Sequence, residues 1–103
     1  MKNNLTNTAQ LELSLTALDL CDALLENMLN DAAYGETRSR GTVLAYGRLD
    51  GLCKALAAVS YHGAATSIID STLKAYNGMG DATMQRGLLM LIDQTADTLR
   101  KGL

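Results

Sequence analysis

Side chains that could do acid–base or metal chemistry are few in this sequence and lie far apart. The only histidine, His62, has no cysteine or acid nearby at the spacing of metal ligands, so no zinc site is expected. Glu12, Asp19 and Glu26 recur every seven residues, which places them on one side of a helix, and we call them the acidic stripe. Carboxylates that converge can serve as acid and base or bind Mg²⁺. These three are spaced too widely to converge, so we interpret the stripe as a docking face for basic groups of a partner.

The sequence contains no glycine-rich phosphate loop and no nucleophile motif. Residues 77–80, NGMG, precede a predicted helix, but they follow no strand and contain no lysine, so they are interpreted as a turn. The sequence therefore predicts a protein that is not an enzyme and that uses no cofactor and no metal.

Four predicted helices position all of these residues. Apolar residues recur at helical spacing, proline is absent, and no segment alternates in the manner of a strand. The expected helices cover about 8–33, 38–61, 66–77 and 81–101, with Gly35 and Gly63 at breaks and Asp81 as an N-cap. The second and third could instead be one helix bent at Gly63. The predicted fold is all-α, a compact bundle or orthogonal array of four helices. One domain is expected at residues 8–103, after a flexible polar N-terminus at residues 1–7.

The first predicted helix has an apolar arc of roughly 220°, about twice the width found on a surface helix. Either the helix lies centrally under two or more others, or part of its face meets a second chain. The half expected to remain for a partner or a dimer consists of Leu13, Leu20, Leu24 and Met28. Asp22 falls within the arc and is expected to reach its edge.

The second and fourth predicted helices carry further candidate contact residues. Gly47 and Gly51 lie four apart inside a helix, where each glycine costs about 1 kcal/mol relative to alanine. Either another helix approaches both closely, or the fold simply tolerates the cost. The fourth helix is expected to place Met84, Leu88, Leu91, Ile92, Thr95 and Leu99 in the core. Met90 stands among its polar residues as a candidate for adaptable contacts.

Charge and cysteine content narrow the class of protein. The net charge is −2, but residues 1–34 carry −4 and residues 35–63 carry +2, which predicts an acidic helix beside a basic one. The two cysteines, Cys21 and Cys53, are expected to be reduced and buried. No signal peptide and no run long enough to span a membrane is present, so a cytoplasmic protein without membrane contact is expected.

Three functions fit these features. The first is a small protein–protein interaction protein, a regulator, adaptor or inhibitor of bacterial or phage origin, with homodimerisation as the economical use of its surface. The second is a helix-turn-helix-like DNA-binding regulator turning at Gly63, although its recognition helix is poor in base-reading side chains. Its contacts would be Arg38, Arg40, Arg48, Thr66, Ser67 and Lys74. The third is a ligand-sensing bundle with a pocket lined by Tyr46, Cys53 and Met28.

Overall fold

The computed structural model describes residues 7–58, 65–78 and 81–101, and four helices occupy nearly all of them. These are α1 (Asn7–Ala33), α2 (Arg40–Ala58), α3 (Thr66–Gly78) and α4 (Ala82–Lys101), and the described residues contain no strand. The all-α prediction is confirmed. Residues 1–6 of the predicted flexible N-terminus, the expected end of the second helix at residue 61 and the predicted break at Gly63 lie outside the described residues.

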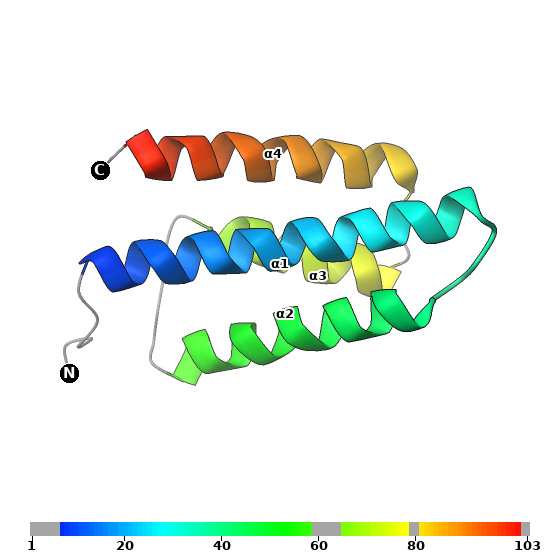
Figure 1. Ribbon diagram of the computed structural model, residues 1–103, viewed down its shortest axis with the longest axis horizontal. Helices are drawn as coiled ribbons and strands as arrows, with labels where there is room; N and C mark the ends of the chain where they lie inside the picture. The colour runs from blue at the N-terminus through cyan, green and yellow to red at the C-terminus, as the bar shows by residue number, and fades with distance from the viewer. Residues whose placement is uncertain (1–6, 59–64, 79–80, 102–103) are drawn as a thin grey trace.

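Helix α1 is the centre of the bundle. It contacts α2, α3 and α4, whereas the described parts of α2 and α4 make no contact with each other. Figure 1 shows α1 running between α4 and α2, with α3 behind it. A helix with three neighbours must bury a wider face than one that packs from a single side, and this accounts for the width of the apolar arc.

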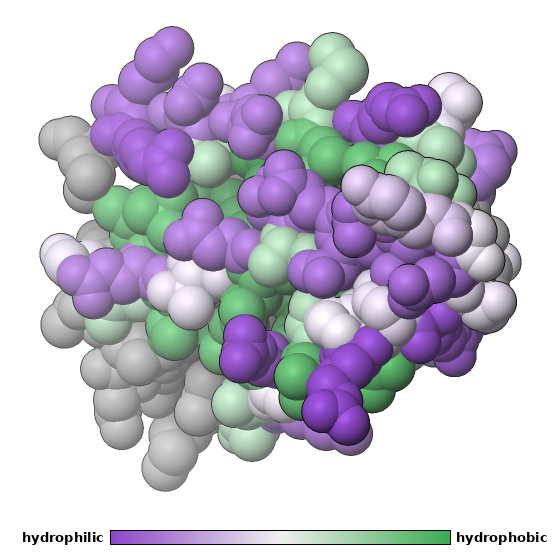
Figure 2. Space-filling view, turned by 45° about the vertical axis from the view of Figure 1, so that its right-hand side comes forward, coloured by the Kyte–Doolittle hydropathy of each residue, from purple (hydrophilic) through white to green (hydrophobic). Residues whose placement is uncertain are grey.

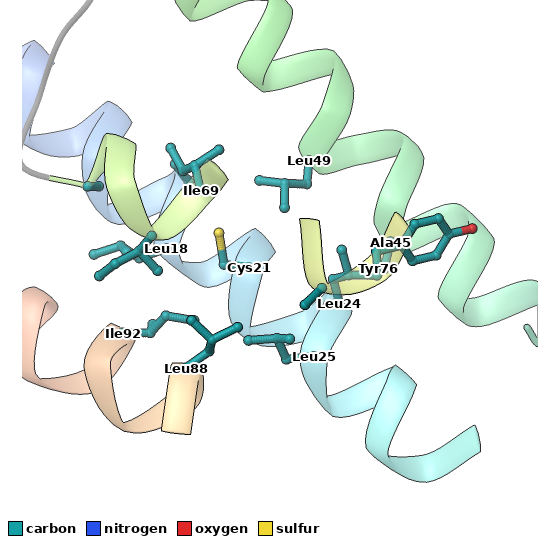
Figure 3. Close-up of a cluster of buried hydrophobic side chains, with 14 of the residues drawn as sticks. Leu18, Cys21, Leu24, Leu25, Ala45, Leu49, Ile69, Tyr76, Leu88 and Ile92 are labelled. Atoms are coloured by element: carbon teal, nitrogen blue, oxygen red, sulfur yellow. The ribbon is translucent and has the colours of Figure 1, made fainter. Parts of the chain in front are cut away.

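The core forms where the four helices face one another. Cys21, Leu24 and Leu25 of α1 are completely buried, as is Leu49 of α2. Figure 3 shows these side chains pointing toward Ile69 of α3 and toward side chains of α4. The labelled members of the cluster are Leu18, Cys21, Leu24, Leu25, Ala45, Leu49, Ile69, Tyr76, Leu88 and Ile92. Helix α1 contributes the largest share of these residues.

Glycine and an aspartate set two of the helix ends. Gly35 has a φ of 71° and follows α1. The N–H of Glu36 donates to the carbonyl of Asp31 (2.8 Å) and that of Gly35 to Ala32 (3.4 Å), the pattern of a Schellman motif. Asp81 accepts a hydrogen bond from the N–H of Met84 at Oδ1 (2.8 Å), so the predicted N-cap of α4 is confirmed.

The buried face of α4 is rotated relative to the prediction. Leu88 and Ile92 are buried as expected, but Met84 and Leu91 are nearly half exposed. The buried stripe of α4 consists of Gln85, Leu88, Ile92 and Ala96. The hydrophobic pattern of the sequence predicted that Met84 would be buried and not Gln85. The position of α4 against α1 and α3 decides which side of the helix faces inward.

Candidate functional site

The acidic stripe lies on the solvent side of α1. Glu12, Asp19 and Glu26 are all exposed. Asp22 is half-buried at the edge of the apolar arc, and partial burial, with Glu26, Asp93 of α4 and Asp19 nearby, raises its pKa. Within the described residues, no group of three histidine, cysteine or acidic side chains could hold a metal ion. The geometry therefore offers a row of solvated carboxylates along α1, supplemented by acids at its border with α4.

Two of the four residues expected to form a leftover surface on α1 belong to the core. Leu24 is completely buried and Met28 nearly so, and both contact other core residues of the same chain. They therefore offer no surface to a partner in this structure. Leu13 and Leu20 are half-buried against the core and retain some accessible area.

One accessible apolar face of the described chain lies on α2. Val43 is 49% exposed and Leu44 55% exposed, and both are on the side of α2 that points away from its core residues. Gly47 and Gly51 continue this side by one and two turns, and a Cβ at either position would meet no atom within 4 Å. None of the described helices approaches them closely. We call Val43, Leu44, Gly47 and Gly51 the outer α2 face.

Basic side chains border the outer α2 face. Arg40, Arg48 and Lys54 are exposed on α2, and we call them the basic rim. Nζ of Lys54 lies 2.9 Å from a carboxylate oxygen of Asp50. Arg40 and Arg48 make no ion pair with any other described residue. The rim therefore leaves two guanidinium groups available to an acidic ligand or partner.

The residues of the DNA-binding hypothesis are spread over three places. Arg38 lies in the turn before α2, where its Nη2 donates a hydrogen bond to the carbonyl oxygen of Tyr76 (3.2 Å). Ser67 and Lys74 are exposed on α3, while Thr66 is half-buried at the start of that helix. The turn that would define the motif, with Gly63 and His62, lies outside the described residues.

The turn between α1 and α2 is organised by a buried carboxylate that the sequence interpretation missed. Asp31 is only 4% exposed and accepts hydrogen bonds at Oδ2 from Oγ1 of Thr42 (2.6 Å) and the N–H of Ser39 (3.0 Å). Burial by itself would raise the pKa of Asp31, but the hydrogen bonds from Thr42 and Ser39 outweigh it and hold the pKa below its usual value. The sequence did contain a signal for this site. Asp31 is an acid on the apolar arc just before Gly35, and Ser39 and Thr42, which can donate hydrogen bonds, follow it.

A small pocket opens beside this turn. It has a volume of about 150 Å³ and lies between the end of α1, the turn, and the neighbouring ends of α3 and α4. Its lining includes Met28, Asp31, Arg38, Tyr76 and Gln85. Of the three residues named for the predicted ligand pocket, Met28 lines this one and Tyr46 and Cys53 do not.

Arg38 and Tyr76, which line the pocket, form a stack with Tyr46 of α2. The guanidinium carbon of Arg38 lies 4.4 Å from the centroid of the Tyr76 ring. The centroids of the Tyr46 and Tyr76 rings lie 4.1 Å apart, and the angle between the ring planes is 17°. Because Tyr46 covers one face of the Tyr76 ring, Arg38 occupies the other. The stack ties the turn to α3 and α2 and gives the pocket a rigid wall.

Other exposed apolar side chains lie on α4, namely Met84, Met90 and Leu91. Figure 2 shows one side of the molecule, on which hydrophilic side chains are interspersed with small hydrophobic areas. On α4, Met90 is 64% exposed, as the sequence indicated. None of the described helices is both long enough and apolar enough to cross a membrane.

Comparison with known proteins assigns no family. No protein-family model matches this chain, and searches of curated proteins and of solved structures find no significant match. Any assignment of function must therefore rest on the surfaces and the pocket described above.

Proposed function

We propose that this chain is a non-enzymatic interaction protein that binds another protein through the outer α2 face. The observation that carries the proposal is the pair of open glycines beside two exposed aliphatic side chains. Gly47 and Gly51 have empty space where a Cβ would be, and Val43 and Leu44 stand about half exposed next to them.

The glycines favour a helical partner. Inside a helix each costs about 1 kcal/mol relative to alanine, and no described residue of the same chain makes a contact that would compensate. Helix axes pack about 8–10 Å apart, and small residues at the contact allow the closest approach. A partner helix laid across Gly47 and Gly51 would bring its side chains onto Val43 and Leu44.

Within this proposal, the chain acts as a regulator, adaptor or inhibitor. The absence of a constellation for catalysis in the sequence and the simple four-helix frame are consistent with work done by a surface. A cytoplasmic location is part of the proposal, because a buried free thiol such as that of Cys21 suits a reducing compartment.

Site-specific photo-crosslinking tests the proposal. We expect the full chain with p-benzoylphenylalanine at position 47 to form covalent adducts in an extract of the source cell, and the same chain with the probe at Ser71 to form far fewer. Ser71 is the matched control because it is exposed on α3, away from the outer α2 face. Equal adduct yields at the two positions would remove the outer α2 face as the binding surface.

A second candidate function, small-ligand sensing, is favoured by the pocket beside the α1–α2 turn. The pocket of about 150 Å³ combines Arg38, Asp31 and Gln85 with the thioether of Met28 and the ring of Tyr76. Polar groups of both charges beside an apolar wall suit a small polar molecule. A thermal-shift series with small amines, acids and amino acids should then raise the melting temperature of the native chain but not of Ala32→Trp, which fills the pocket from its rim. Identical shifts in both chains, or none in either, would exclude the site.

A further inference from the structure

The two charged surfaces of this chain have matching lengths. The acidic stripe occupies positions 12, 19 and 26, and the basic rim occupies positions 40, 48 and 54. The first and last residues of each set are the same number of positions apart, about 21 Å at a rise of about 1.5 Å per residue. Both sets lie on long helices and are exposed.

The surfaces between these charges also fit together. The outer α2 face has no side chain at Gly47 and Gly51. On α1, the exposed residues beside the acidic stripe include Thr16 and Ala23, which are small as well. An α1 helix can therefore approach α2 closely enough for carboxylates and guanidinium groups to meet across the contact.

We propose that the outer α2 face and basic rim of one copy bind the acidic stripe of a second copy, head to tail. The inference rests on the proposed function, because it uses the same outer α2 face and names its partner. The contact is heterologous, so in a pair one copy keeps its acidic stripe free and the other keeps its outer α2 face free, and further copies add in the same way.

Charge distinguishes this arrangement from a two-fold dimer through α2. A two-fold axis through the glycines would place Arg48 next to its own symmetry mate and would bring the two basic rims together. Like charges placed opposite each other oppose association. The head-to-tail contact instead pairs each basic rim with carboxylates.

The contact should be weak and sensitive to salt. One helix laid on another buries less than the roughly 1,200–2,000 Å² of a stable interface. Exposed charges are screened over about 10 Å at about 0.1 M salt. Sedimentation velocity of the native chain at about 0.02 M salt should therefore show a mass that rises with concentration above the monomer value of 11.0 kDa, and about 0.5 M salt should return it to that value.

Complementary charge reversals provide the decisive experiment. The chain with Arg40→Glu and Arg48→Glu and the chain with Asp19→Arg and Glu26→Arg should each remain monomeric at low salt. Mixed in equal amounts, they should associate in alternation. The native acidic stripe of the first chain meets the native basic rim of the second, and the reversed rim of the first meets the reversed stripe of the second. A chain carrying all four substitutions should associate as the native chain does. The control is the chain with Lys74→Glu and Arg86→Glu. It makes the same change in net charge as Arg40→Glu with Arg48→Glu, but at exposed positions on α3 and α4, and it should leave association unchanged.

Specific results would overturn the inference. A native chain that stays at 11.0 kDa up to about millimolar concentration at low salt would do so, as would a mixture of the two reversed chains that remains monomeric. If the native chain is monomeric while the probe at position 47 still forms adducts with another protein, the proposed function stands and the head-to-tail contact fails. If neither occurs, both fail. Circular dichroism of every variant checks that the helices are retained.

Discussion

Oγ1 of Thr42 donates a 2.6 Å hydrogen bond to the carboxylate of Asp31, and this bond fixes the start of α2 against the end of α1. Asp31 and Thr42 are both buried. A buried carboxylate is stable only when its oxygens are well bonded, so the two residues depend on each other.

Replacing Asp31 by asparagine should destabilise the fold. Asparagine keeps the shape but loses the charge that strengthens the bonds from Thr42 and Ser39, and the expected loss is about 1–3 kcal/mol in the free energy of unfolding. Urea denaturation monitored by circular dichroism measures it. Asp19→Asn, on the solvent side of the same helix, is the matched control and should change stability by less than about 0.5 kcal/mol. Equal effects at the two positions would mean that the bonds to Asp31 contribute nothing.

The carboxylate of Asp31 should make the free energy of unfolding depend on pH in the acidic range. The pKa of Asp31 is lower in the folded chain than its usual value of 3.8, so in that range the unfolded chain binds more protons. The stabilisation is complete above about pH 4 and is lost as the pH falls through the folded pKa. Urea midpoints measured from pH 6 to pH 2 should fall more steeply for the native chain than for Asp31→Asn. Parallel curves would contradict this assignment.

Asp22 should have the opposite effect. Partial burial, followed by the nearby charges of Glu26, Asp93 and Asp19, raises its pKa above the usual value. Its ionised form therefore opposes folding at neutral pH. Asp22→Asn should increase stability at pH 7 by about 0.2–1 kcal/mol, a size limited by solvent screening at this half-exposed position. The gain should disappear once the pH falls below the usual pKa of an aspartate.

Alanine substitutions at two glycines of α2 should have opposite signs. At Gly51 a Cβ meets no atom within 4 Å, so Gly51→Ala should stabilise the chain by about 1 kcal/mol. At Gly41 a Cβ would lie 2.8 Å from Oδ1 of Asn27, whose side-chain amide donates to the carbonyl of Ala23. Gly41→Ala must displace that side chain and should gain less or destabilise. Thermal unfolding of both variants distinguishes a local packing effect from a uniform gain in helix propensity.

The two cysteines should react at very different rates. Burial raises the pKa of the Cys21 thiol to about 11, so at pH 8 only about one thiol in a thousand is ionised, and the side chain is inaccessible. Cys53 is half-buried, and burial followed by the charge of Asp70 raises its pKa as well. Mass spectrometry after treatment with iodoacetamide should find Cys53 modified first and Cys21 only after unfolding. Cys53→Ser should remain unmodified in the folded state.

The helices were predictable because their signals are local. Gly35 and Asp81 end and begin helices through backbone geometry and a single hydrogen bond, which depend on few neighbours. The width of the apolar arc on α1 also indicated a helix with several neighbours. What it could not indicate was whether Leu24 would be covered by the same chain or by another, because that depends on where α2, α3 and α4 lie.

The features of the candidate sites were less predictable, since they depend on contacts distant in sequence. Arg38 and Tyr76 meet across the bundle, and nothing in the spacing of either residue indicates this stack. The exposed glycines Gly47 and Gly51 were recognisable from sequence as a contact candidate. The structure adds that the space over them is open within one chain.

The contact between α1 and α4 joins the first and last helices of the described chain, and this affects how the protein can be made. During translation the side of α1 that α4 covers has no partner until α4 has left the ribosome. Leu18 and Leu25, which are buried in the finished bundle, would meet water or a chaperone throughout that interval. The nascent chain can therefore complete its core only after almost all of the described sequence has been synthesised.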